Sequence, residues 1–376
     1  MRVGVLTSSR ADYGVYLPLL KAIEADSFFE LKIIAFGTHV SKQHGYTIDQ
    51  IKQDGFKVEV QLGNLISGDS EKAISSIIGN TILKFSSVWK ILKDKIDLVF
   101  ALGDRYEMFA AVSASVPFNI PIAHIHGGET TLGAIDNKFR HAITLMSKYH
   151  FTSTVNYAKK VSALIGTKNN INNVGALSLD NLLDLELLDK EAFKERWNIN
   201  LDIPTILTTF HPETISLEKN KVYAIELVKT LKVLTSNYQI VITMPNADTM
   251  GTVIRKKLEQ IVEQNPKVIS VENFGTLGYF SCIKHSSFLL GNTSSGIIEA
   301  ASFGKYVINL GDRQKGRAQS NNIYNEKIQK RNILEAVQRI EKNNYNFTGK
   351  NIYADDAKTS LQIIDAIKKI KHLPNK

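Results

Sequence analysis

The sequence of 376 residues contains a single cysteine, Cys282, which excludes an internal disulfide and any zinc site built from several cysteines. No stretch approaches the roughly 18 consecutive apolar residues of a membrane-spanning helix. The first residues also lack the apolar run and cleavage pattern of a secretion signal. We therefore expect a cytoplasmic protein that works in a reducing compartment and has no membrane partner.

Three common motifs for nucleotides and metals are absent as well. The chain has no Gly-Lys-Ser/Thr phosphate loop, no GxGxxG and no HExxH. Sites for ATP, NAD and a zinc hydrolase are thus unsupported. We expect a protein that uses neither a metal nor a cofactor.

The composition is that of a folded protein with an excess of positive charge: 43% hydrophobic, 22% charged and a net charge of +9. The lysines are interleaved with glutamates, as in KLEQIVEQNPK, and only KKIKHLPNK is locally basic. A nucleic-acid binder needs a basic stripe with aromatic platforms, and none is visible. We interpret the lysines as a solvated surface that can attract an anionic small substrate.

Short runs rich in Val and Ile alternate with longer amphipathic segments, which is typical of buried parallel strands and the helices between them. Expected strands are residues 2–8, 29–37, 57–62, 97–104, 121–128, 150–155 and 172–178, then 205–212, 238–246, 268–274, 287–294 and 305–312. Expected helices include residues 14–26 and 221–236.

The chain is too long for one ordinary core, so the pattern predicts two doubly wound, Rossmann-like α/β domains. We place the first at residues 1–176 and the second at 177–354. A last helix, about residues 355–376, is expected to pack back on the first domain. The two domains are expected to face each other across a cleft.

Polar clusters follow the predicted strands, where open α/β sheets bind ligands. They read SSRADYG, GDRYE, HIHGGE, FHPET, PNAD and GNTSSG. In GNTSSG, the helix start with Thr293, Ser294 and Ser295 can bind a phosphate, and Glu299 can hold ribose hydroxyls. An ordinary helix cap is the alternative interpretation.

Two further clusters carry charged or titratable groups. Arg10 in SSRADYG can meet a pyrophosphate bidentately, or it can be a surface arginine beside a cap. LGDR occurs twice, ending at Arg105 and Arg313, and His211 follows the first strand of the second domain. The stretch HIHGGETTLGAIDNKFRH gathers three histidines and two carboxylates, which favours acid–base chemistry on a sugar more than a metal site.

Together the motifs SRADYG, LGDRYE, HIHGGETTLGAID…RHAIT, FHPET, GNTSSGIIE and INLGDRQKGR resemble, in order, the hydrolysing UDP-N-acetylglucosamine 2-epimerases of bacterial sialic and legionaminic acid biosynthesis. The resemblance runs over nearly the whole chain. It implies two Rossmann-like domains in the glycosyltransferase-B arrangement, with a nucleotide in the cleft. It also implies assembly as a homodimer or homotetramer.

The resemblance implies the site residues in two groups. The UDP group is Arg10, His211, Asn246, Phe274, Thr293, Ser294, Ser295, Glu299 and Arg313. The catalytic group is Asp104, His126, Glu129, Asp136, Arg140 and, again, His211. Some members have HIEGGE, with a glutamate where this chain has His126. Either His126 takes the place of that glutamate, or Glu129 supplies the carboxylate.

The reaction implied by the resemblance converts UDP-GlcNAc to free N-acetylmannosamine and UDP, by anti elimination to a 2-acetamidoglucal and then hydration. The same reaction on UDP-2,4-diacetamido-2,4,6-trideoxyglucose is an alternative. So are a non-hydrolysing 2-epimerase and a non-catalytic UDP-sugar sensor. Asp104, Glu129 and Asp136 are all present, which counts against the sensor.

Overall fold

The computed structural model describes the chain except residues 42–45, 64–67, 69, 216, 246–250 and 371–376. It divides into two compact units. Unit 1 contains Met1–Glu129, Asp136–Asp184 and the chain from Tyr353 onward, and unit 2 contains Thr130–Ile135 and Leu185–Ile352. Each unit is built around one parallel sheet, which confirms the doubly wound α/β fold class.

Unit 1 has a seven-stranded sheet in the order β3-β2-β1-β4-β5-β6-β7, with every pair parallel. Its strands are β1 (Arg2–Thr7), β2 (Glu30–Phe36), β3 (Val58–Leu62), β4 (Leu98–Leu102), β5 (Ile122–Ile125), β6 (Tyr149–Thr152) and β7 (Ile171–Asn173). Its α-helices are α1 (Arg10–Glu24), α2 (Ile48–Gln53), α3 (Glu71–Leu92), α4 (Tyr106–Ser115), α5 (Asp136–Met146), α6 (Val155–Ile165), α7 (Asp180–Asp184) and α14 (Thr359–Lys368). The 3-10 turns are η1 (Gly37–Val40), η3 (Val116–Phe118) and η4 (Leu177–Leu179).

Unit 2 has a six-stranded parallel sheet in the order β10-β9-β8-β11-β12-β13. Its strands are β8 (Thr205–Thr209), β9 (Gln239–Thr243), β10 (Val268–Val271), β11 (Phe288–Gly291), β12 (Val307–Leu310) and β13 (Ile323–Glu326). Its helices are α8 (Lys190–Trp197), α9 (Asn220–Leu234), α10 (Gly251–Gln264), α11 (Gly275–His285), α12 (Ser294–Ile298) and α13 (Lys330–Lys342), with η5 (Leu217–Lys219) and η6 (Ala300–Phe303).

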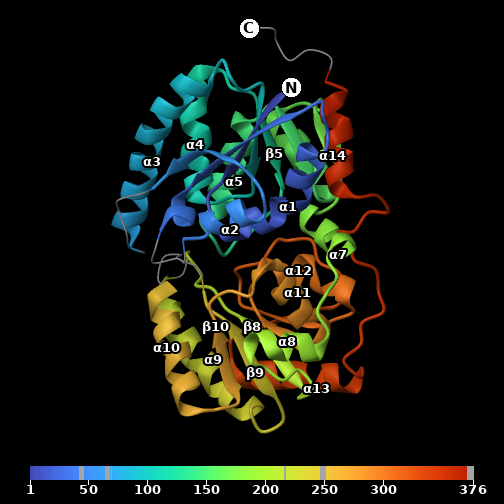
Figure 1. Ribbon diagram of the computed structural model, residues 1–376. Helices are drawn as coiled ribbons and strands as arrows, with labels where there is room; N and C mark the ends of the chain where they lie inside the picture. The colour runs from blue at the N-terminus through green and yellow to red at the C-terminus, as the bar shows by residue number, and fades with distance from the viewer. Residues whose placement is uncertain (42–45, 64–67, 69, 216, 246–250, 371–376) are drawn as a thin grey trace. The chain divides into compact units, whose positions relative to one another are not determined.

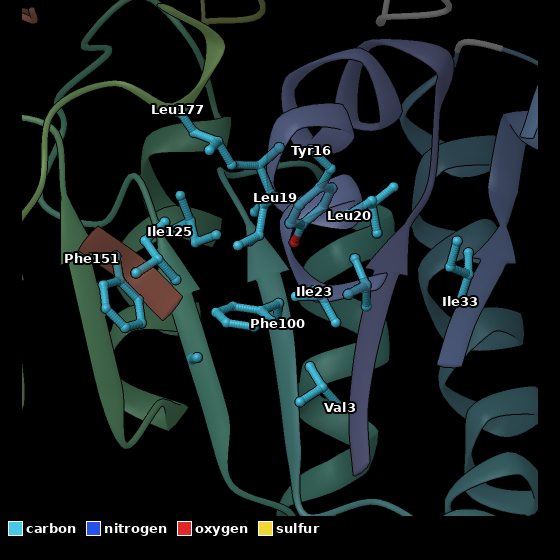
Figure 2. Packing of buried hydrophobic residues seen from close by; sticks show 14 of the residues in the cluster. Val3, Tyr16, Leu19, Leu20, Ile23, Ile33, Phe100, Ile125, Phe151 and Leu177 are labelled. Atoms are coloured by element: carbon cyan, nitrogen blue, oxygen red, sulfur yellow. The ribbon is translucent and has the colours of Figure 1, made fainter. Parts of the chain in front are cut away.

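The core of unit 1 covers both faces of its sheet. One buried cluster lies under α1 and α14, and a second lies under α3 and α4. Figure 2 shows the α1 side, with labels on Val3, Tyr16, Leu19, Leu20, Ile23, Ile33, Phe100, Ile125, Phe151 and Leu177. The red helix α14 runs beside the blue α1 in Figure 1, and its Ile363, Ile364 and Ile367 belong to the same cluster.

Several expected strands end a few residues earlier in the structure, and three further differences stand out. The helix expected from residue 14 begins at Arg10, because Ser9 caps it by accepting from the N–H of Asp12. The strand expected at 172–178 ends at Asn173. Strand β13 was missed because it is an edge strand with the partly exposed sequence IYNE, so it lacks the apolar signal of a buried strand.

None of the helices among the described residues combines the length and the apolar character that crossing a bilayer requires.

Candidate active site

The order of strands reverses between β1 and β4 in unit 1 and between β8 and β11 in unit 2. Ligands of doubly wound sheets bind at such reversals, beyond the carboxyl ends of the strands. Arg10 and Asp104 follow β1 and β4, while His211 and Thr293 follow β8 and β11. The topology therefore places four of the predicted residues at the two switch points.

His126 lies directly after β5 and adopts a left-handed backbone with φ of 64°. A non-glycine residue in this region is strained, and such strain is characteristic of functional sites. The two glycines that follow it permit close packing: a Cβ on Gly128 would lie 2.5 Å from the carbonyl oxygen of Tyr157. The HIHGG sequence thus folds into a tight, closely packed turn after β5.

The His126 ring is fixed from one side only. Its Nδ1 lies 2.8 Å from Oε1 of Glu129, and because a carboxylate only accepts, Nδ1 carries the proton. Nε2 is buried and has no hydrogen-bond partner among the described residues. In the neutral ring that atom is the one with a free lone pair, so His126 is arranged as a base.

Glu129 is completely buried and collects several donors. Besides His126, the hydroxyl of Ser153 donates to Oε1 at 2.8 Å. Nη1 of Arg140 lies 3.8 Å from Oε2. A carboxylate enclosed in this way is held in place, so Glu129 orients groups around it.

Arg140, on α5, joins this cluster to the loop after β4. Its Nη1 donates to the carbonyl oxygen of His126 at 2.7 Å, and its Nη2 pairs with Oδ2 of Asp104. Asp136 is the first residue of the same helix, one turn before Arg140. The structure therefore brings Asp104, His126, Glu129 and Arg140 into one connected network, with Asp136 on the helix that carries it.

His124 and His150 are neighbours on β5 and β6 and play a different part. Burial lowers the pKa of His124 to about 3 and that of His150 to about 4. His124 donates from Nε2 to the carbonyl oxygen of Gly103 at 2.8 Å. These two rings are buried and neutral, and both ring nitrogens of His124 are hydrogen-bonded within unit 1.

The loop before α1 is shaped by a buried carboxylate. Asp12 accepts from the N–H of Ser8 at 3.0 Å and from its hydroxyl at 2.6 Å. Burial raises the pKa of Asp12. The loop presents Arg10 as the first residue of α1, at the switch point of unit 1.

In unit 2, GNTSSG forms a sharp passage from β11 into α12. Gly291 has φ of 148°, and a Cβ there would lie 1.9 Å from the carbonyl oxygen of Thr209, so only glycine fits. Thr293 is the N-cap and Ser294 the first residue of a helix of five residues, followed by η6. Glu299 lies at its other end and is buried.

His211 is held through its backbone. Its N–H donates to Oδ1 of Asn292 at 2.7 Å, and its carbonyl accepts from Nδ2 of Asn292 at 2.8 Å. Nε2 of Gln314 in turn donates to the carbonyl oxygen of Asn292 at 2.8 Å. The loops that follow β8, β11 and β12 are thus joined by hydrogen bonds. Asn292 and Gln314, which make these bonds, were not recognised from the sequence.

The second LGDR motif closes around Glu213, another residue that the sequence did not single out. The N–H of Asp312 donates to its Oε1 at 2.6 Å, and a Cβ on Gly311 would lie 2.3 Å from that oxygen. Burial raises the pKa of Glu213, while backbone N–H groups of Asp312 and Arg313 oppose the rise. Glu213 therefore shapes the loop that carries Arg313.

The expected UDP group also includes Phe274 and Asn246. The Phe274 ring is only 5% exposed and packs against Phe193 and Trp197, with ring centroids 5.4 and 5.3 Å away. The ring is therefore used in the core of unit 2, which leaves little of it to face a uracil. Asn246 lies outside the described residues.

The segment between Glu129 and Asp136 belongs to unit 2, although both flanking residues belong to unit 1. The N–H of Leu132 donates to the carbonyl oxygen of Lys315 at 2.9 Å, and the N–H of Ile135 donates to the hydroxyl of Thr214 at 2.9 Å. A Cβ on Gly133 would lie 2.4 Å from the carbonyl oxygen of Asp312. Residues 130–135, in the middle of the motif HIHGGETTLGAID, therefore pack against the second LGDR loop.

A solved structure of UDP-GlcNAc 2-epimerase from Neisseria meningitidis, bound to UDP-GlcNAc, matches this fold with a TM-score of 0.81. The match covers 98% of this chain and 100% of that one at 19% identity, so it shows the fold. The architecture is that of the nucleotide-sugar 2-epimerases.

The sequence relatives are closer. The chain is 31% identical to the UDP-N,N'-diacetylbacillosamine 2-epimerase (hydrolyzing) of Legionella pneumophila, over 97% of this chain and 95% of that one. It is 32% identical to the GDP/UDP-N,N'-diacetylbacillosamine 2-epimerase (hydrolyzing) of Campylobacter jejuni, over 90% and 87%. The profile of the family described as UDP-N-acetylglucosamine 2-epimerase matches residues 21–368. The chain belongs to this family and is an enzyme of the 2-epimerase class, which confirms the resemblance read from the motifs.

Proposed function

We propose that the protein is a hydrolysing 2-epimerase, which converts a UDP-linked 2-acetamido sugar and water into UDP and the free sugar inverted at carbon 2. The names of the two relatives support the hydrolysing reaction. The observation that carries the proposal is the His126 ring, whose Nδ1 is fixed by Glu129 while the buried Nε2 remains without a partner among the described residues.

The first step breaks the bond from carbon 1 to the UDP oxygen and removes the proton on carbon 2. That proton is weakly acidic, because carbon 2 is not adjacent to a carbonyl. Departure of UDP must therefore lead and build positive charge on the ring, which Asp104 and Asp136 stabilise. Nε2 of His126 takes the proton, the electron pair forms the ring double bond, and a 2-acetamidoglucal and UDP result.

The second step adds water across that double bond. A carboxyl group that has taken up a proton delivers it to the opposite face of carbon 2, the water oxygen bonds to carbon 1, and the proton that the water loses returns to this carboxylate, while His126 releases the proton of the first step to solvent. Asp104 and Asp136 are the carboxyl groups that we assign to this exchange. The sum of the two steps is hydrolysis with inversion at carbon 2.

Unit 2 supplies most of the groups that we assign to the nucleotide, and unit 1 supplies Arg10. The start of α12 and the hydroxyls of Thr293 and Ser294 meet phosphate, and His211 assists the pyrophosphate. Glu299 binds the ribose hydroxyls. The set is completed by the guanidinium groups of Arg10 and Arg313, by the backbone at Phe274 near the uracil, and by Ser295 and Asn246.

Two sugars are candidates for the substrate. The names of the relatives favour UDP-N,N'-diacetylbacillosamine, the 2,4-diacetamido-2,4,6-trideoxyglucose derivative. The ligand of the meningococcal structure favours UDP-GlcNAc. Both have the 2-acetamido group and the UDP leaving group that the two steps need, and they differ at carbons 4 and 6. We propose that the product feeds the synthesis of a sialic-type acid and that the chain assembles as a dimer or tetramer.

Proton NMR of the purified enzyme with each nucleotide sugar in heavy water tests the reaction. We expect free UDP and a mannosamine-type sugar that carries deuterium at carbon 2, formed faster from the preferred substrate. A UDP-linked epimer would show the non-hydrolysing reaction instead. Tight UDP binding without turnover of either sugar would favour the sensor.

The nucleotide assignment predicts a loss of UDP affinity in two variants. Ser294→Ala removes a hydroxyl from the start of α12, and Glu299→Ala removes the ribose carboxylate. Each is expected to weaken UDP binding about tenfold, which corresponds to one hydrogen bond to a charged group. Isothermal titration calorimetry measures this, with Ser302→Ala as the control because Ser302 is an exposed serine of η6. Unchanged affinity in both variants would contradict the assignment.

A further inference from the structure

We propose that Glu129 and Ser153 form a positioning pair that sets the proton of His126 on Nδ1 and leaves Nε2 as the base. This inference rests on the proposed function for its kinetic consequences, but its structural content stands on the geometry of unit 1. Ser153 follows β6 directly, at the carboxyl end of a strand beside β5. None of the motifs that suggested the site includes it.

The hydrogen bonds define the order of the pair. The Ser153 hydroxyl donates to Oε1 of Glu129 at 2.8 Å, and the same oxygen accepts from Nδ1 of His126 at 2.8 Å. Because one carboxylate oxygen accepts both bonds, the serine and the histidine compete for its charge. All three side chains are buried, so water does not replace either bond at low cost.

The surrounding charges agree with this arrangement. Arg140 lies on the other carboxylate oxygen at 3.8 Å and also pairs with Asp104. His124 and His150 are the histidines on the strands beside His126, and burial keeps both neutral by lowering their pKa values to about 3 and about 4. The charge that acts directly on the His126 ring is therefore that of Glu129.

The pair of Glu129 and Ser153 also acts on the strained backbone of His126. His126 has φ of 64°, and a Cβ on the neighbouring Gly127 would lie 3.1 Å from Nδ1 of His124. The turn is therefore closely packed around a strained backbone. Glu129 and Ser153 hold the ring in the strained turn as well as in its tautomer.

Two variants with opposite expected effects test the proposal. In Glu129→Gln the negative charge beside the imidazolium is lost, so the acidic limb of the kcat/KM profile moves to lower pH. The amide can present either its oxygen or its nitrogen to Nδ1, so it no longer fixes the ring proton there, and kcat falls about 10²-fold or more, as when an orienting carboxylate is lost from other His-based sites. In Ser153→Ala the carboxylate keeps its charge and loses a donor, so the acidic limb moves to higher pH with a smaller loss of kcat.

Ser115→Ala is the matched control. Ser115 is a buried serine at the last residue of α4, and its hydroxyl donates to the carbonyl oxygen of Val112 at 2.7 Å. The Ser115→Ala variant loses a serine hydroxyl and its hydrogen bond, as Ser153→Ala does. Its kcat/KM profile against pH is expected to match that of the wild type. The proposal would be overturned if the acidic limbs of the kcat/KM profiles of Glu129→Gln and Ser153→Ala stay where the wild type has them. It would also be overturned if the two limbs move in the same direction.

A measurement without substrate separates this proposal from the proposed function. Nitrogen-15 NMR of histidine-labelled protein, with the His126 signals assigned from His126→Asn, reports which ring nitrogen is protonated. We expect the ring proton on Nδ1 in the wild type and divided between Nδ1 and Nε2 in Glu129→Gln. If the wild type turns over neither sugar, the proposed function fails while this result still decides the inference. Protonation on Nε2 in the wild type would refute it.

Discussion

Asp104→Asn is expected to reduce kcat at least about 10³-fold while UDP affinity changes less than about threefold. Asparagine keeps the shape of the side chain and removes the charge that pairs with Arg140 and that we assign to stabilising the sugar cation. The nucleotide groups of unit 2 are untouched by this change. UDP release measured with a coupled assay gives kcat, and calorimetry gives UDP affinity. Asp136→Asn is expected to behave in the same way.

Asp97→Asn provides the control for this experiment. Asp97 precedes β4, whereas Asp104 follows it, and it pairs with Arg2 at 2.5 Å at the opposite end of the strand. The variant loses one carboxylate from unit 1 without reaching the network of Arg140. It is expected to keep wild-type kcat. Wild-type turnover in Asp104→Asn would remove that residue from the mechanism.

Acid is expected to unfold unit 1 before unit 2. Burial lowers the pKa of His39 to about 4, of His124 to about 3 and of His150 to about 4, and all three belong to unit 1. A histidine with a folded pKa below its unfolded value near 6.5 stabilises the protein above that value and loses the contribution as pH falls. Between pH 7 and pH 5 the folded state loses about 2 kcal/mol of stability through each histidine, or about 6 kcal/mol through the three together. Asp12, whose pKa is raised by burial, opposes the trend as a single group.

The two tryptophans of the chain allow each unit to be followed separately. Trp89 is buried in unit 1, where its Nε1 donates to the carbonyl oxygen of Ala111, and Trp197 lies in α8 of unit 2. Urea unfolding of Trp197→Phe therefore reports unit 1, and that of Trp89→Phe reports unit 2. The unit 1 midpoint is expected to fall steeply from pH 7 to pH 5.

His150→Phe is the variant that identifies the source of this effect. Nδ1 of His150 is buried without a hydrogen-bond partner among the described residues, so an apolar ring removes the titration and leaves no new donor or acceptor unpaired. About a third of the pH dependence should disappear. A unit 1 midpoint that is flat over this range would contradict the assignment of buried neutral histidines.

The sequence predicted the site best where a single rule applies to many residues, namely that ligands bind beyond the carboxyl ends of parallel strands. Polar clusters at strand ends led to Asp104, His211 and Thr293, and the topology places all three at switch points. Ser153 and Glu213 obey the same rule but were missed. Their importance comes from partners 24 and 99 residues away, and a single sequence does not show such pairs.

Other differences have equally physical reasons. Strand β13 is a polar edge strand, so its sequence lacks the hydrophobic signal that identified the central strands. The Phe274 ring is an aromatic core residue beside Trp197, which the position of the motif could not reveal. The motif HIHGGETTLGAID lies inside the expected first domain of residues 1–176, yet its residues 130–135 belong to unit 2, because close backbone packing at Gly133 is a tertiary property.

The division of the chain into units also has a consequence for the order of folding during synthesis. Unit 2 is complete in sequence once Ile352 has been made, since its remote segment, Thr130–Ile135, is made earlier. Unit 1 begins at Met1 but lacks part of its core until α14 appears, because Ile363 and Ile367 pack under α1. A nascent chain is therefore expected to close its second unit first and its first unit last. A truncation after Asp184 would expose the apolar surface that α14 covers, so the N-terminal half is a poor fragment to express alone.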